Sequence, residues 1–317
     1  MTARRVGAVD CGTNSIRLLV ADVDDEGLLT DVVRRTEVVR LGQGIDRTGV
    51  IAPEAMERTL AVSREYAATC REHGVEDARF VATSASRDAR NADEFVCGVV
   101  QAFGDLDVAP EVVPGDEEAR LSFTGATGDL RRLGVPGPYL VVDLGGGSTE
   151  LVRGTDDVEA GRSVDIGCVR LHERHLASDP PTDDEVVAAR ADVALALHEA
   201  EEVVDLSGLG AVVGLAGSIT TVTAHVLGLA AYDRDAVHLA RVGLDAHREA
   251  SRELLGMTRD ERGALPYMHP GRVDVIGAGA LVWHELLGRV ALRSPGAAVV
   301  TSEHDILDGI ALSVAAR

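Results

Sequence analysis

The sequence predicts an α/β protein made of two similar lobes, and three observations lead to this prediction. Its 317 residues exceed one ordinary domain and are enough for two. Apolar, β-rich runs alternate with helical patterns along the chain. A strand that ends in aspartate, a glycine turn and a second strand occur together twice, at 6–24 and at 139–154. We therefore expect a duplicated unit, with a mixed sheet and flanking helices in each lobe.

The first lobe is expected to span residues 1–130. After the first two strands, the pattern predicts a strand at 30–41, a helix at 53–73, a strand at 78–85, a helix at 91–103, a strand at 111–114 and a helix at 117–130. Glycine and proline are frequent in residues 131–139, which is typical of a connection between lobes.

The second lobe is expected to span residues 131–317. After its two opening strands, the pattern predicts a strand at 158–166, a helix at 183–204, a strand at 211–217, a helix from Ser218, helices at 244–255 and 273–287, a strand at 297–302 and a last helix at 305–317. We expect this last helix to pack on the first lobe, and we expect a ligand in the cleft between the lobes.

Composition excludes several kinds of partner. Acidic residues outnumber basic ones 52 to 31, and a net charge of −21 repels nucleic acid and anionic lipid. No apolar run is long enough for a signal peptide or a membrane span, so we expect a cytoplasmic protein. The four cysteines form no metal-binding motif and are expected to be reduced: Cys11, Cys70, Cys97 and Cys168.

The first glycine turn follows Asp10. Gly12 allows a tight turn in which backbone N–H groups can face a phosphate, while the Asp10 carboxylate faces a hydrated cation. An ordinary hairpin turn explains the same residues equally well. The candidate phosphate-binding residues of this turn are Asp10, Gly12, Thr13, Asn14, Ser15 and Arg17.

The second turn contains three consecutive glycines, Gly145, Gly146 and Gly147, followed by Ser148. Three glycines are costly in backbone entropy, and a close approach of the backbone to a ligand explains them better than a bulge does. Asp143 and Glu150 enclose the turn, and their carboxylate oxygens suit Mg²⁺, with Mn²⁺ as an alternative. Glu150 could instead be a solvated strand residue.

The third turn, Gly217-Ser218, lies between an apolar strand and a predicted helix. The N-terminus of a helix presents free N–H donors and a partial positive charge, which suits an anion. Ser218 alone is better explained as a helix N-cap. Three such turns in one chain favour a site for phosphate groups.

Six segments, taken in order, resemble the exopolyphosphatase and guanosine pentaphosphate phosphatase family, which belongs to the actin, sugar kinase and heat-shock chaperone superfamily. The segments are VDCGTNSIRLLV, ATSASRDARN, PGDEEARLSFTG, VVDLGGGSTELV, IGCVRL and GLAGSITT. The resemblance covers nearly the whole chain and implies two actin-like, ribonuclease H-like lobes with the active site in the interlobe cleft.

The resemblance also implies roles for individual residues. Glu118 matches the catalytic base, and Arg87 matches an arginine that holds substrate phosphate. Asp143 and Glu150 match the metal positions, and the three turns match phosphate-contacting loops. Without the family match, Glu118 is explained as an acid at a helix N-terminus. Arg17, Arg90 and Arg120 are further candidates for a basic lining, although each alone is a typical surface charge.

Two departures from the family affect the substrate. Longer members continue into a helical region beyond the two lobes, so short polyphosphates are the favoured polymer here. Asp308 stands where many relatives have an arginine, and His304 is a candidate substitute.

The sequence thus predicts an exopolyphosphatase that releases orthophosphate from inorganic polyphosphate. A guanosine pentaphosphate phosphohydrolase, a sugar or acetate kinase on the same fold, and a catalytically silent nucleotide sensor are the alternatives. A homodimer is expected from the resemblance alone.

Overall fold

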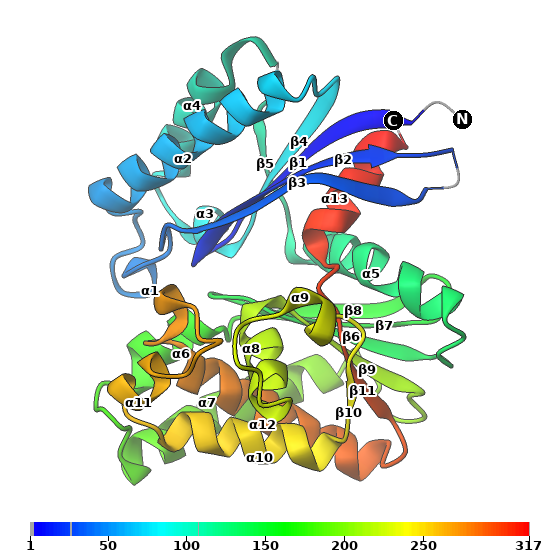
Figure 1. Cartoon of the computed structure of the whole chain (residues 1–317). Helices are drawn as coiled ribbons and strands as arrows, with labels where there is room; N and C mark the ends of the chain where they lie inside the picture. The colour runs from blue at the N-terminus through cyan, green and yellow to red at the C-terminus, as the bar shows by residue number, and fades with distance from the viewer. Residues whose placement is uncertain (1–2, 26, 107, 317) are drawn as a thin grey trace. The chain divides into compact units, whose positions relative to one another are not determined.

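The computed structural model describes residues 3–25, 27–106 and 108–316. The chain divides into two compact units (Figure 1). Unit 1 comprises Met1–Gly125 and Ile306–Arg317, and unit 2 comprises Ala126–Asp305. Helix α5, Gly115–Arg132, contains the first boundary, so its first part belongs to unit 1 and its second part to unit 2.

Unit 1 contains a five-stranded mixed sheet with the order β3-β2-β1-β4-β5. Strand β1 pairs antiparallel with β2 and parallel with β4. The strands are β1 Arg4–Cys11, β2 Ser15–Val23, β3 Leu29–Val38, β4 Asp77–Ala82 and β5 Pro110–Val112. The other elements are α1 Ile45–Thr48, α2 Pro53–Glu72, α3 Ser84–Asp88, α4 Ala92–Phe103, η1 Gly104–Leu106, the start of α5, and α13 Ile306–Ala315.

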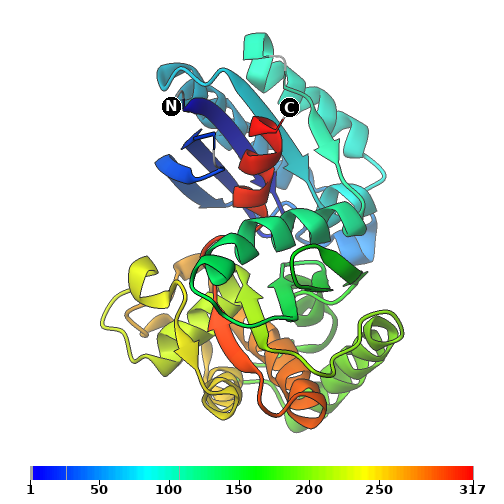
Figure 2. The same ribbon diagram turned by 90° about the vertical axis from the view of Figure 1, so that its right-hand side faces the viewer.

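The two faces of this sheet are buried by different elements. Alternate side chains of a strand point to opposite faces, so Val9 and Cys11 pack with α2 and α4, whereas Val6 and Ala8 pack with α13. Figure 2 shows α13, the last helix of the chain, lying against the sheet. Its buried Asp308 forms an ion pair with Arg34 of β3 at 2.5 Å. The final segment of the chain therefore completes the core of the first unit.

Unit 2 contains a six-stranded mixed sheet with the order β10-β11-β9-β6-β7-β8. The strands are β6 Tyr139–Leu144, β7 Thr149–Gly154, β8 Val158–Val164, β9 Ala211–Leu215, β10 Arg241–Val242 and β11 Ala298–Thr301. The helices are α6 Cys168–His175, α7 Asp183–Glu201, α8 Ala216–Val226, α9 Arg234–Val237, α10 Leu244–Gly256, α11 Arg259–Gly263, η2 Pro270–Arg272 and α12 Ile276–Arg293.

The core of unit 2 is formed where α6, α7, α8, α10 and α12 pack with the sheet. Trp283 of α12 is fully buried in it and donates its indole N–H to Nδ1 of His247 on α10 at 3.3 Å. The sheets of both units share the series antiparallel, antiparallel, parallel, parallel, read from β3 in unit 1 and from β8 in unit 2. The predicted α/β fold, with a mixed sheet in each of two repeated units, is confirmed.

Several predicted boundaries were wrong. Strand β9 ends at Leu215 and α8 begins at Ala216, so Ser218 is the third residue of the helix and not its N-cap. Helix α12 begins at Ile276 and continues to Arg293, past Gly288. Among the described residues, no helix has the length and apolar composition that crossing a membrane requires.

Candidate active site

The first two glycine turns have the same backbone hydrogen bond. The N–H of Gly12 donates to the carbonyl of Ser15 at 2.9 Å, and the N–H of Gly145 donates to that of Ser148 at 3.0 Å. Each turn joins two antiparallel strands directly after an aspartate, Asp10 in unit 1 and Asp143 in unit 2. The repeat inferred from the sequence therefore extends to the geometry of the turns.

The residue opposite the aspartate differs between the two turns. Asp10 pairs across the sheet with Arg17, whose guanidinium donates to its Oδ2 at 2.6 and 2.9 Å. In unit 2, Asp143 is opposite Glu150, and both are buried. Directly opposed residues on antiparallel strands share a face, and like charges there destabilise the sheet unless something compensates them. Ser163 donates to Oε1 of Glu150 at 2.6 Å, which orients that carboxylate.

The two buried acids have the donor chemistry of a divalent-cation site. Both supply hard carboxylate oxygens from neighbouring strands on one face of the sheet. A dication would offset the negative charge that the two side chains bring together. The chemistry of these two side chains therefore fits Mg²⁺ or Mn²⁺.

In unit 1, a chain of contacts joins the first turn to helices α3 and α5. Thr13 lies in the turn, and its hydroxyl is 2.8 Å from that of Ser84 in α3. Arg87, at the end of α3, donates to Oε2 of Glu118 at 3.2 Å and to the carbonyl of Val113 at 3.1 Å. The sequence-predicted base and arginine are thus in direct contact, although 31 positions separate them.

Glu118 occupies a position that stabilises a carboxylate. It lies in the first turn of α5, where free backbone N–H groups favour negative charge. Its side chain is buried, and Arg87 is partly exposed. A buried acid beside a cation can orient a water molecule and accept its proton.

In unit 2, the triple-glycine turn packs against the start of α6. The N–H groups of Cys168 and Val169 donate to the carbonyls of Gly145 and Gly146 at 3.0 and 2.9 Å. A Cβ atom at Gly167 would lie 2.4 Å from the carbonyl carbon and oxygen of Gly146, so only glycine allows this approach. The turn is thus held in place by the backbone of the IGCVRL segment.

The third turn begins α8 with a strained residue. Ala216 has φ of 64°, in the left-handed region that residues with a Cβ rarely adopt. Ser218 is buried in the first turn of the helix, next to Cys168. Burial raises the pKa of the Cys168 thiol, even though Ser218 and Arg272 lower it in part.

Arg272 is a candidate that the sequence analysis missed. Its guanidinium lies against Gly217, where a Cβ atom would be 2.4 Å from it, and its Nη1 donates to the hydroxyl of Thr221 at 3.2 Å. It comes from η2, more than fifty residues after the turn, and no motif marks it. At this position the guanidinium of Arg272 supplies positive charge, and the N-terminus of α8 supplies free backbone N–H donors.

The remaining predicted residues have other surroundings. The carbonyl of Asn14 accepts hydrogen bonds from Val39 and Arg40 at 3.1 and 2.8 Å, which ties the first turn to the segment after β3. Arg90 is exposed and donates to the carbonyl of Thr48, and the exposed Arg120 lies 3.9 Å from Asp116. These two arginines have the environment of ordinary surface charges.

Two units that repeat one series of strand pairings define the class of protein, a two-unit α/β protein with a mixed sheet in each unit. Within that class, the chain belongs to the Ppx/GppA phosphatase family, whose model matches residues 19–314.

Individual relatives agree with the family assignment. The chain is 51% identical to Exopolyphosphatase 2 of Mycobacterium tuberculosis, over 99% of this chain and 100% of that one. It is similar to a crystal structure described as an exopolyphosphatase-like protein, with 45% identity and a TM-score of 0.94, covering 99% of this chain and 98% of the other. An exopolyphosphatase from Cytophaga hutchinsonii matches with 25% identity and a TM-score of 0.83, covering 96% of each chain.

Proposed function

We propose that this chain is an exopolyphosphatase, which hydrolyses the terminal phosphoanhydride bond of inorganic polyphosphate and releases orthophosphate. One observation carries the proposal: the buried Glu118 is held at 3.2 Å by Arg87, so an acid for water and a cation for phosphate lie side by side. The 51% identity to Exopolyphosphatase 2 of Mycobacterium tuberculosis, over both whole chains, supports the choice of substrate.

The reaction assigns a separate task to each residue. Arg87 binds oxygens of the terminal phosphate and neutralises part of their charge. Glu118 orients a water molecule and accepts its proton as the water oxygen bonds to the terminal phosphorus. The bond from that phosphorus to the bridging oxygen breaks, and the remaining chain leaves one phosphate shorter.

We also propose that Asp143 and Glu150 hold Mg²⁺. When bound, the cation supplies positive charge to the phosphate oxygens of the reacting group. Backbone N–H groups of Gly145–Gly147 and of Gly217 and Ser218, together with Arg272, would supply further hydrogen bonds to phosphate. Asp10 is already neutralised by Arg17, so we assign the metal to the acids of unit 2.

A phosphate-release assay tests the substrate. Short polyphosphate, long polyphosphate, guanosine pentaphosphate and ATP are compared with and without Mg²⁺. We expect polyphosphate to be the best substrate and release to need no acceptor, which distinguishes hydrolysis from a kinase. Guanosine pentaphosphate as the best substrate would support the second activity that the family name contains. Ligand-induced stabilisation without turnover would favour a silent sensor.

Glu118→Gln tests the mechanism. The amide keeps the shape of the side chain but cannot accept the proton, so we expect kcat to fall by about a hundredfold or more while KM changes little. Glu117→Gln is the matched control, because Glu117 lies in the same helical turn and pairs with Arg79. Equal activity of Glu118→Gln and the wild type would refute the assigned role.

Location and assembly complete the proposal. The family assignment favours a cytoplasmic protein. The net charge of −21 disfavours nucleic-acid partners, because it repels their phosphates. A homodimer follows from family resemblance, and light scattering after gel filtration tests it.

A further inference from the structure

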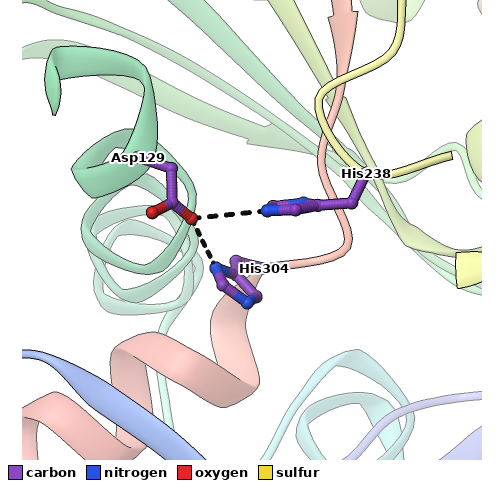
Figure 3. Close-up of side chains that lie close together, drawn as sticks. All are labelled: Asp129, His238 and His304. Atoms are coloured by element: carbon purple, nitrogen blue, oxygen red, sulfur yellow. Dashed lines mark hydrogen bonds and ion pairs between the residues drawn. The ribbon is translucent and has the colours of Figure 1, made fainter. Parts of the chain in front are cut away.

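A cluster of three metal-ligating side chains lies in unit 2, and none of the three is among the residues assigned to catalysis. Asp129 comes from α5, His238 follows α9, and His304 follows β11. Figure 3 shows that both imidazoles face the same carboxylate. Nδ1 of His304 lies 2.7 Å and Nε2 of His238 3.4 Å from Oδ2 of Asp129. All three ligand atoms lie within 4.8 Å of one another.

We propose that Asp129, His238 and His304 bind a divalent transition-metal ion of the Zn²⁺ class, with water completing the coordination. Two imidazoles and one carboxylate are a typical ligand set for such ions. Bond lengths of about 2.0–2.2 Å place neighbouring ligands of a tetrahedral site about 3.3 Å apart. Nε2 of His238 and Oδ2 of Asp129 are already separated by about this distance. Nδ1 of His304 is closer to Oδ2, so it must move away by about 0.6 Å when the metal binds.

The surrounding hydrogen bonds hold the ligands close to this arrangement. The hydroxyl of Ser302 accepts from the N–H of His304 at 3.0 Å and donates to its carbonyl at 2.8 Å, which fixes the backbone of that residue. The centroids of the two imidazole rings are 4.5 Å apart. Such outer contacts reduce the ordering that a metal ion must impose on its ligands.

Asp129 is ionised and has one oxygen directed at the histidines. Burial opposes its ionisation, but Arg132 and His304 more than offset this and lower the pKa of the carboxyl. Arg132 bonds to Oδ1, whereas both histidines face Oδ2. A metal ion at Oδ2 can therefore replace the two imidazole contacts while Arg132 keeps its own.

Binding requires a proton to move in both histidines. Nδ1 of His304 donates to the Asp129 carboxylate, so its proton moves to Nε2 when Nδ1 binds the metal. His238 rearranges further. Its Nδ1 accepts the backbone N–H of Glu303 at 3.2 Å, so the neutral ring carries its proton on Nε2, facing Asp129. Coordination through Nε2 moves that proton to Nδ1 and gives up the Glu303 contact. This contact lies at the long end of the hydrogen-bond range, so metal coordination can outweigh it.

This site differs in chemistry from the pair Asp143 and Glu150. Imidazole nitrogen favours transition metals, whereas carboxylate oxygens alone suit Mg²⁺. Asp129 lies just after the first boundary between the units, and His304 lies just before the second, at Asp305 and Ile306. A bound ion would link α5 to residues 302–305 and so restrain both segments through which the chain passes between units. The inference does not depend on the proposed catalysis.

Isothermal titration calorimetry of the metal-free protein with Zn²⁺ tests the proposal. We expect one equivalent to bind with a micromolar or lower Kd and to raise the melting temperature, and millimolar Mg²⁺ to leave this binding unchanged. Co²⁺ in place of Zn²⁺ should give the visible absorption of a tetrahedral site. Absence of stoichiometric Zn²⁺ binding would overturn the proposal.

Variants locate the ion. His238→Gln and His304→Gln should each weaken Zn²⁺ binding by about tenfold or more. His175→Gln is the matched control, because His175 also contacts an aspartate, Asp192 at 3.0 Å, but belongs to no such three-ligand cluster among the described residues. If a histidine variant fails to fold, Asp129→Asn replaces it in the experiment. This variant keeps the size of the side chain but removes the carboxylate ligand, so it should also weaken Zn²⁺ binding. Unchanged affinity in the folded variants would contradict the assignment.

Discussion

The surroundings of two ionisable residues in this protein favour opposite charge states. Asp10 has a charged partner, whereas His247 is buried without one among the described residues. Asp10 keeps its charge because Arg17 lies 2.6 Å away. His247 is instead fully buried in unit 2 and accepts the indole N–H of Trp283. Burial alone lowers the pKa of His247 to about 4. The first arrangement favours the charged form and the second the neutral form.

His247 should make unit 2 sensitive to mild acid. In the unfolded chain this group takes up a proton near pH 6.5, while in the folded protein it remains neutral down to about pH 4. The unfolded state therefore binds more protons between these values, and stability falls as the pH decreases through this window. We expect the free energy of unfolding to be about 2 kcal/mol lower at pH 5 than at pH 7.5 from this group.

Urea unfolding followed by tryptophan fluorescence measures this effect, because Trp283 is the only tryptophan and contacts His247. His247→Gln cannot take up a proton and should reduce the difference between the two pH values. His198→Gln, at an exposed position of α7, should keep the wild-type difference. The same pH dependence in His247→Gln as in the wild type would contradict the explanation.

The candidate site was partly predictable because some of its residues occur in motifs. The glycine turns and the acids beside them could be found from spacing within a few positions, and Glu118 and Arg87 from resemblance. Arg272 could not be found, since nothing local marks an arginine whose partner, Gly217, is distant in sequence. The contrast between Asp10 and Asp143 also needed the strand register, which places Arg17 opposite one and Glu150 opposite the other.

Among the helices and strands, the length of an element was the main reason why it could or could not be predicted from the sequence. The long helices α2 and α7 were predicted within about three residues, and α7 begins with a capping box at Thr182 and Glu185. The short helices α1, α3, α6, α9 and α11 were missed, since four to eight residues show too little of a period. The end of α12 was also missed: the predicted helix stops at 287, but Gly288 lies inside α12 near Arg248.

Two helical glycines should respond in opposite ways to the same substitution. Gly128 of α5 is exposed, and no heavy atom of the described residues would lie within 4 Å of a Cβ atom at this position. Gly128→Ala should therefore stabilise the protein by about 0.5–1 kcal/mol. At Gly309 of α13, a Cβ atom would lie 2.0 Å from the carbonyl oxygen of Leu121. Gly309→Ala should destabilise the protein by about 1–3 kcal/mol.

Thermal unfolding followed by circular dichroism compares the two variants with the wild type. The pair controls for helix propensity, because both substitutions replace glycine by alanine within a helix. Shifts of the melting temperature in the same direction would show that the backbone contact at Gly309 does not govern the result.

For the whole molecule, the important feature is that unit 1 is discontinuous in sequence. Its sheet is formed by residues near the N-terminus, while one face of that sheet is covered by α13. Ile306, Leu307 and Ile310 are buried there, and Asp308 pairs with Arg34. This also explains the departure from the family at position 308, because the aspartate serves as an internal ion-pair partner.

Removal of α13 should therefore disrupt unit 1. A chain that stops after Asp305 exposes Val6, Ala8 and Leu19, and breaks a buried ion pair. Hydrogen exchange should show loss of protection in β1, β2 and β4, whereas helices α10 and α12 of unit 2 keep theirs. A chain that stops after Ala315 retains the last buried contact, Val314, and is the control. Full protection of β1 in the shorter chain would refute this expectation.

The return of the chain to unit 1 also bears on how the protein is made. A ribosome releases the residues of β1 before those of α13, so the first sheet waits for its covering helix until all of unit 2 has been synthesised. Unit 2, being continuous, can fold while the nascent chain is still tethered. During that interval the uncovered apolar face of the early sheet is a natural substrate for chaperones.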